Sequence, residues 1–179
     1  HRVPGCTPLY LYFVFYNYRS KVDILRQKIT KDNINDLVFF GNNSKEIDFF
    51  SLDVDGNDYW VLKSMDLSKI KVICCEYNHW LGSNEKLSLK YNKDFHFVDN
   101  GIFGASLLAF TDLLKEKGFS LVAVESSGTN AFYVNNTYAN HFEILCPIKN
   151  FISVGRFYSN DKKKEIFKNI ENSNLFVEV

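Results

Sequence analysis

Short apolar runs alternate with helical patterns along the chain, an arrangement that is typical of repeated strand–helix–strand units. The clearest predicted strand is Ile47–Asp53, and Lys71–Tyr77 is a second apolar run that we expect to be a buried strand. Between these runs, Val61, Leu62 and Met65 are spaced so that they share one face of a helix. The pattern therefore predicts two neighbouring parallel strands that are joined by one helix.

The segments on either side continue this alternation. A short connection joins the last two predicted strands, so we expect them to pair as an antiparallel hairpin. The pattern as a whole predicts an α/β fold, a Rossmann-like three-layer sandwich whose parallel sheet closes with that hairpin. The further elements expected are a strand at Lys21–Thr30, a helix that Asp32 or Asn33 caps and that ends at Val38, a helix at Ala105–Lys117, and strands at Phe119–Glu125 and Asn130–Asn135.

We expect one α/β domain at residues 1–150, lacking the usual first strands of its fold, and a helical or irregular extension at residues 151–179. The chain has 179 residues, a length at which one domain is the default. It begins with His1 and not with Met, so we expect a processed chain or a piece of a longer protein. The aromatic run Leu9–Tyr16 is too short for a membrane helix, which needs about 20 residues, and predicts a buried or half-buried strand.

Charge and cysteine spacing limit the partners that we expect. Lysine and arginine number 21 and aspartate and glutamate also 21, so the overall charge does not favour nucleic acid. The cysteines show no metal-type spacing, and Cys74 and Cys75 lie in an apolar run typical of core residues. We expect a cytoplasmic protein without a nucleic-acid partner or a membrane span. An unpaired edge of its incomplete sheet would allow a homo-oligomer.

Acidic side chains follow the two predicted parallel strands at the point where each strand ends. Asp53, Asp55 and Asp58 come after the first strand, and Glu76 ends the second. A right-handed crossover brings the carboxyl ends of neighbouring strands to one edge of the sheet, about 4.8 Å apart, so we expect these carboxylates to lie close together. Crowded carboxylates at such an edge can bind a hard cation, share a proton or hydrogen-bond a polyhydroxylated substrate.

The acidic segment is compatible with several kinds of chemistry. An EF-hand loop counted from Asp53 is excluded, because it needs Gly where Asp58 stands and Glu where Ser64 stands. A phosphatase of the haloacid-dehalogenase type is disfavoured, since it needs Thr where Asn57 stands. A metal-dependent nucleotide-sugar glycosyltransferase that uses Asp53 and Asp55 stays open. A non-catalytic interaction domain also stays open.

Three segments resemble the C-terminal half of FkbM-related methyltransferases, which are S-adenosylmethionine-dependent enzymes of class I. The segments are DFFSLDVDGNDYWVLKSM, VICCEYN and GASLLAFTDLLKEKGFSLVAVESSGTNAFYVNN, which lie in order within residues 22–136. The glycine-rich turn that holds the cofactor in this family has no Gly-x-Gly counterpart in the chain. The resemblance therefore implies an incomplete class I methyltransferase fold, in a truncated or inactive piece or in an active enzyme.

The resemblance also implies an activity and roles for particular residues. The expected activity is methylation of a hydroxyl on a sugar, a glycan-linked group or a natural product, with S-adenosylmethionine as the cofactor. Asp53, Asp55 and Glu76 are the expected catalytic residues, acting as a general base or holding a divalent metal that lowers the pKa of the acceptor hydroxyl. The residues expected to bind this small-molecule or glycan substrate are Asn57, Asp58, Tyr77, Asn78, His96 and Ser106.

Overall fold

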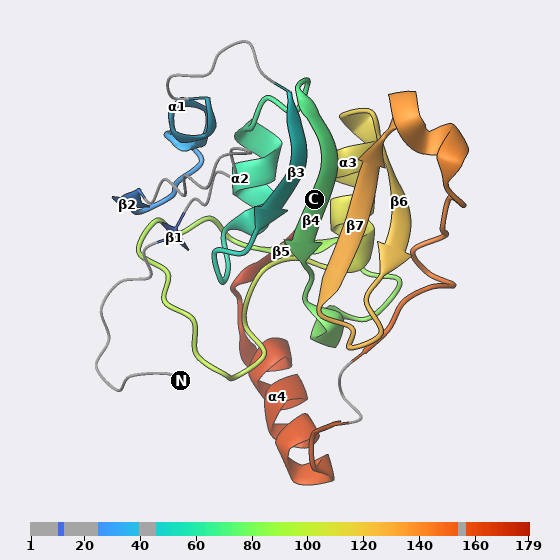
Figure 1. The fold of residues 1–179 in the computed structure, drawn as a ribbon. Helices are drawn as coiled ribbons and strands as arrows, with labels where there is room; N and C mark the ends of the chain where they lie inside the picture. The colour runs from blue at the N-terminus through green and yellow to red at the C-terminus, as the bar shows by residue number, and fades with distance from the viewer. Residues whose placement is uncertain (1–10, 13–24, 40–45, 154–156) are drawn as a thin grey trace.

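The computed structural model places a four-stranded sheet at the centre of the molecule, in the order β3-β4-β7-β6 (Figure 1). Strands β3 and β4 are parallel, whereas β7 is antiparallel to both of its neighbours, as the predicted closing hairpin requires. The four strands are β3 (Ile47–Leu52), β4 (Ile70–Glu76), β6 (Phe119–Val124) and β7 (Asn130–Asn135). The residues that the structure describes are 11–12, 25–39, 46–153 and 157–179.

Helices α2 (Asp58–Ser64) and α3 (Leu107–Glu116) lie behind the sheet in Figure 1. Their buried residues form one hydrophobic cluster with the strand side chains that point toward them, among them Leu52, Ile73 and Tyr133. Full burial of one aliphatic side chain of this size contributes roughly 1.5–3 kcal/mol to stability. This cluster holds β3 and β4 in the parallel arrangement that brings their carboxyl ends together.

The opposite side of the sheet faces the viewer in Figure 1, and none of the described helices passes in front of the four strands. Phe49 in β3 points to this side and is 54% exposed. Its partner in register on β4, Val72, is half-buried. The described part of the chain is thus a mixed α/β fold with helices against one side of its sheet. The second helical layer of the predicted three-layer sandwich stays a prediction.

The segment before β3 is less regular than the sequence predicts. In residues 25–30, the described part of the expected strand Lys21–Thr30, only β2 (Arg26–Gln27) forms, and it pairs with β1 (Leu11–Tyr12). The prediction is wrong for residues 28–30, because the Asn33 side chain accepts from the Thr30 amide and donates to the Lys28 carbonyl, which bends the chain. Helix α1 (Ile34–Val38) follows as expected. Its N-cap residue is Asn33, but the predicted side-chain cap is wrong, because the Asn33 side chain makes no hydrogen bond to the helix. Residues 21–24, and most of the predicted strand at residues 9–16, lie outside the described residues.

Two short strands connect the region after β4 with the end of the chain. Strand β5 (Leu87–Leu89) pairs antiparallel with β8 (Phe176–Glu178). Helix α4 (Asn160–Asn172) precedes β8 and packs through Ile166 against Trp80 and Phe103. Residues 157–179 are therefore fastened to the segment that follows β4. Each of the described helices is too short or too polar to span a bilayer.

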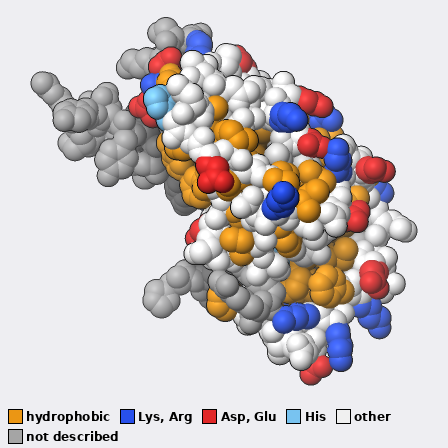
Figure 2. Space-filling view, turned by 90° about the vertical axis from the view of Figure 1, so that its right-hand side faces the viewer, with side chains coloured by type: hydrophobic (Ala, Val, Ile, Leu, Met, Phe, Trp, Pro, Cys, Tyr) orange, Lys and Arg blue, Asp and Glu red, His pale blue; other side chains and the backbone are white. Residues whose placement is uncertain are grey.

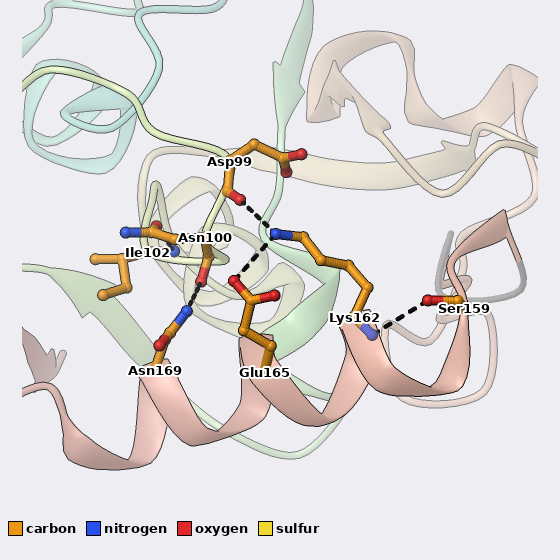
Figure 3. A network of polar contacts seen from close by, with 7 residues as sticks. All are labelled: Asp99, Asn100, Ile102, Ser159, Lys162, Glu165 and Asn169. Atoms are coloured by element: carbon orange, nitrogen blue, oxygen red, sulfur yellow. Dashed lines mark hydrogen bonds and ion pairs between the residues drawn. The ribbon is translucent and has the colours of Figure 1, made fainter.

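Polar contacts also join α4 to the loop before α3 (Figure 3). The Lys162 ammonium donates to the Asp99 carbonyl at 3.2 Å and lies 3.3 Å from a carboxylate oxygen of Glu165. The Asn169 side chain donates to the Asn100 carbonyl at 3.4 Å. Exposed ion pairs of this kind contribute about 0–1 kcal/mol each, so the apolar cluster dominates the docking of α4.

Figure 2 shows the side of the molecule that lies to the right in Figure 1, along which residues 142–153 run. Hydrophobic side chains reach the surface there in several patches, and basic and acidic side chains are interspersed between them. Phe142, Ile144 and Ile148 are each about half exposed, at 49%, 52% and 48%. Isolated surface apolar groups are common in folded proteins, so these residues alone indicate no partner.

Candidate active site

Three carboxylates meet at the carboxyl ends of β3 and β4. Leu52 and Cys75 are partners in the parallel register, so the next residues, Asp53 and Glu76, lie side by side. One carboxylate oxygen from each of Asp53, Asp55 and Glu76 lies within 4.8 Å of the other two. The expected proximity of these side chains is confirmed, and we call the three residues the acidic rim.

The loop after β3 turns sharply at Asp55, whose φ is 58°. Among the described residues, no other non-glycine residue has a left-handed backbone, a conformation that costs an L-residue roughly 1–2 kcal/mol. Asp58 begins α2, is 2% exposed, and accepts hydrogen bonds from the Val54 amide at 2.9 Å and the Gly56 amide at 3.0 Å. The predicted substrate ligand Asp58 thus faces the backbone of its own loop.

Burial raises the pKa of two carboxyl groups at this edge. The pKa of Glu76 rises to about 8, mainly through desolvation and then through the charges of Asp53, Asp58 and Asp55. The pKa of Asp58 rises to about 6, again mainly through desolvation, although the hydrogen bond from the Val54 amide opposes the rise. A carboxyl with a pKa near neutrality can both take up and return a proton at working pH. Glu76 therefore has the proton affinity that acid–base chemistry requires.

The loop after β5 packs against the acidic segment. Asn57 donates from its side chain to the Asn92 carbonyl at 2.9 Å, and its side-chain oxygen accepts from the Asn92 amide at 3.2 Å. A Cβ added at Gly56 would lie 2.5 Å from the Phe95 ring, so the ring sits directly against the Gly56 backbone. The predicted substrate ligand Asn57 thus holds this loop in place beside the acidic rim.

Gly56→Ala is expected to lower the free energy of unfolding by about 1–2 kcal/mol, because the added methyl group overlaps the Phe95 ring. Urea unfolding measures this loss. The matched background is Phe95→Ala, in which the methyl group has room and Gly56→Ala should cost no more than a few tenths of a kcal/mol. Equal losses in the two backgrounds would contradict the packing of Phe95 on Gly56.

A protein-family model described as the methyltransferase FkbM domain matches residues 11–121, which is more than half of the chain. The chain belongs to the FkbM methyltransferase family. The resemblance of the sequence segments to this family is thereby confirmed. The match contains β3, the acidic segment and β4, and therefore all three residues of the acidic rim. Searches of curated proteins and of solved structures gave no match.

In this FkbM domain the Asn78 side chain hydrogen-bonds backbone groups of the segments around it. It is fully buried, and its side-chain amide donates to the carbonyls of Gly101 and Phe103 at 2.9 and 2.8 Å. Its side-chain oxygen accepts from the Trp80 amide. Buried backbone groups need such partners where no regular ladder supplies them. Asn78 thus ties the end of β4 to the loop before α3.

The other predicted substrate ligands differ in their exposure. The Tyr77 hydroxyl donates to the Ile152 carbonyl, and the Tyr77 side chain is fully buried. Ser106 is also fully buried and caps α3 by accepting from the Ala109 amide. His96 is exposed on the loop that packs against the acidic segment. Of these three FkbM-domain residues, His96 is the one that a substrate in solvent can reach directly.

Asn130 is a residue of this edge that sequence reasoning passed over as a strand start. It is the partner of Glu76 in the antiparallel register of β4 and β7. Its side-chain amide donates to a carboxylate oxygen of Glu125 at 3.0 Å. Its position in the sequence could have indicated Asn130, because the first residue of a strand antiparallel to β4 lies at the edge where β4 ends.

Membership of the FkbM family suggests S-adenosylmethionine in general, and the described residues do not fit this cofactor on their own. A nucleoside cofactor needs glycines whose backbone a ligand can approach closely. The chain has no Gly-x-Gly that would supply such a turn. Single glycines of the described part differ: the Cβ position of Gly56 is filled by Phe95, whereas those of Gly82, Gly104 and Gly118 are open. The acidic rim, in contrast, offers the carboxylate oxygens that Mg²⁺, Mn²⁺ and Ca²⁺ prefer.

Proposed function

We propose that this FkbM domain takes part in methyl transfer from S-adenosylmethionine to a hydroxyl oxygen of a sugar, a glycan-linked group or a natural product. The observation that carries the proposal is the convergence of Asp53, Asp55 and Glu76 at one sheet edge of an FkbM-family domain. Ligands of open α/β sheets bind beyond the carboxyl ends of the strands, which is where these carboxylates lie.

In this proposal the acidic rim binds the acceptor and removes its proton. Carboxylate oxygens of Asp53 and Asp55 accept hydrogen bonds from acceptor hydroxyls and fix their position, which by itself lowers the barrier. Glu76, with a pKa of about 8, is the group that takes up the hydroxyl proton. Asn130 lies beside Glu76 and is placed to contact the same ligand.

A divalent cation on the acidic rim is a second way to activate the acceptor. Three carboxylates within 4.8 Å of one another match the ligands that Mg²⁺ and Mn²⁺ take in proteins. Such a cation would lower the pKa of a bound hydroxyl and keep Glu76 ionised. If it binds, Mg²⁺ raises the melting temperature of the unaltered chain more than that of Asp53→Asn, since binding to the folded state stabilises by mass action.

The proposal is tested with this chain and with the full-length product of its gene. S-adenosylhomocysteine is titrated by calorimetry, and methyl transfer is assayed on a panel of sugars. We expect Asp53→Asn and Glu76→Gln to lower kcat/KM at least about 100-fold without changing cofactor affinity. Asp48→Asn is the matched control, because Asp48 is an exposed acid of β3 far from its carboxyl end and should leave activity unchanged.

The same experiment separates the alternatives. The FkbM family match favours methyl transfer over the glycosyltransferase that the Asp-x-Asp spacing left open. Manganese-dependent binding of a nucleotide sugar, without binding of S-adenosylhomocysteine, would contradict the proposal and favour the glycosyltransferase. If the full-length product binds neither ligand, the proposal fails and the non-catalytic interaction domain is the alternative that remains.

The proposal includes the expected setting of the domain. Cys74, Cys75 and Cys146 are free thiols, as in proteins of reducing compartments such as the cytoplasm. In the described part of the chain β3 is an outer strand of the sheet, where a second copy can pair. Sedimentation at several protein concentrations tests this homo-oligomer, and an Asp48→Pro change at the β3 edge should dissociate it.

A further inference from the structure

The carboxylate of Asp58 acts on the loop that carries Asp55. One oxygen accepts from the Val54 amide at 2.9 Å and the other from the Gly56 amide at 3.0 Å. One of these amides precedes Asp55 in the chain and the other follows it. At 2% exposure Asp58 is shielded from water, so solvent cannot replace the two hydrogen bonds.

Asp55 needs such support because its backbone conformation is unfavourable. Its φ of 58° is one that glycine adopts without strain and that an L-residue adopts at a cost. The glycine of this loop stands at the next position, Gly56, where the Phe95 ring leaves no room for a Cβ. Aspartate is one of the few L-residues that adopt this conformation, and hydrogen bonds to the neighbouring backbone amides stabilise it there.

The side chain of Asp55 lies beside two other carboxyl groups. One of its oxygens lies within 4.8 Å of oxygens of Asp53 and Glu76. The backbone conformation of Asp55 sets the direction of its side chain, so this placement depends on the shape of the loop. We infer that Asp58 is a positioning residue that keeps Asp55 in its left-handed conformation and thereby on the acidic rim, which deepens the proposed function and rests on it for the chemistry.

A double-mutant cycle tests this inference on the 179-residue chain. In urea unfolding, Asp58→Asn should lower the folding equilibrium constant about tenfold, because an amide N–H then meets a backbone N–H. In an Asp55→Gly background, Asp58→Asn should lower the folding equilibrium constant about threefold or less, since glycine needs no support at this φ. Equal losses in both backgrounds would mean that Asp58 only caps the turn, which overturns the inference.

Asp66→Asn is the matched control for this cycle. The Asp66 carboxylate also accepts from a backbone amide, that of Ser68 at 3.0 Å, but in a different loop. Asp66→Asn should therefore lower the folding equilibrium constant by the same factor with aspartate or with glycine at position 55. Coupling of Asp66→Asn to Asp55→Gly would show that the cycle reports general destabilisation, and the inference would fail.

A spectroscopic measurement separates positioning from stability. The three-bond coupling between the amide and α protons of Asp55 depends on φ, and we expect Asp58→Asn to change it. An unchanged coupling in a destabilised variant would overturn the inference. If Asp58→Asn does not fold, hydrogen exchange of the unaltered chain decides. The Val54 and Gly56 amides must then exchange more slowly than exposed loop amides, and fast exchange would overturn the inference.

None of these measurements requires methyl transfer, so they remain decisive if the proposed function fails. Where methyl transfer is observed, Asp58→Asn should lower kcat together with Asp55→Asn and leave the affinity for S-adenosylhomocysteine unchanged. A normal kcat for the Asp58 variant beside a low kcat for the Asp55 variant would refute the positioning role and leave the proposed function standing.

Discussion

Gly101→Ala is expected to lower the free energy of unfolding by about 3 kcal/mol and to release α4 from the loop. Gly101 has a φ of 84°, which an alanine adopts at a cost of roughly 1–2 kcal/mol. The added Cβ would also overlap Cγ2 of Ile166, which is fully buried in the cluster with Trp80 and Phe103. Overlap in a close-packed cluster adds roughly 1–3 kcal/mol.

Urea unfolding measures the total loss, and hydrogen exchange of the α4 amides shows whether the helix is released. Gly104→Ala is the matched control, because Gly104 also has a positive φ, 49°, but nothing lies within 4 Å of its added Cβ. It should therefore cost only about 1 kcal/mol. If both variants lose the same free energy, the contact between Gly101 and Ile166 does not dock α4.

Glu76→Gln is expected to stabilise the protein by about 2 kcal/mol at pH 8–9 and to have little effect near pH 4–5. The folded-state pKa of Glu76 is about 8, against an ordinary value of 4.5 for glutamate. Between these values the folded state binds more protons than the unfolded state, so stability falls as pH rises through this window. Glutamine does not ionise and avoids this loss. The full shift would give more than 2 kcal/mol, but solvent screens this half-buried site.

Thermal unfolding from pH 4 to pH 9, with a chelator present to remove divalent cations, measures the effect. The unaltered chain should lose stability with rising pH more steeply than Glu76→Gln does. Glu171→Gln, which removes the charge of an exposed glutamate in α4, is the control and should have the slope of the unaltered chain. If the stability of the unaltered chain and that of Glu76→Gln change in parallel with pH, burial does not raise the pKa of Glu76.

The sheet and the acidic rim could be predicted because local patterns determine them. The apolar runs of β3 and β4 with one helical stripe between them allow little but a parallel pair. Once that pair is expected, Asp53 and Glu76 must share an edge, and the structure places them there. The FkbM family match agrees with the segments from which membership was inferred.

The short strands and the polar contacts could not be predicted in the same way. Strands β5 and β8 have three residues each, too few for a periodic pattern, and Leu89 pairs with the distant Phe176. Asn78 and Ser106 have the residue types and positions of substrate ligands. Both are nevertheless buried against backbone groups whose location depends on the tertiary fold. Residue type alone does not tell a ligand-binding amide from one that satisfies the backbone.

The strand order β3-β4-β7-β6 has a consequence for synthesis on the ribosome. Strand β4 can pair with β3 once both have left the ribosome, but its other edge waits for β7, which is complete only at Asn135. During this interval the nascent chain presents an apolar strand with one open edge, a state prone to association between neighbouring chains. We therefore expect chaperones that bind emerging polypeptides to act on this protein between the translation of β4 and that of β7.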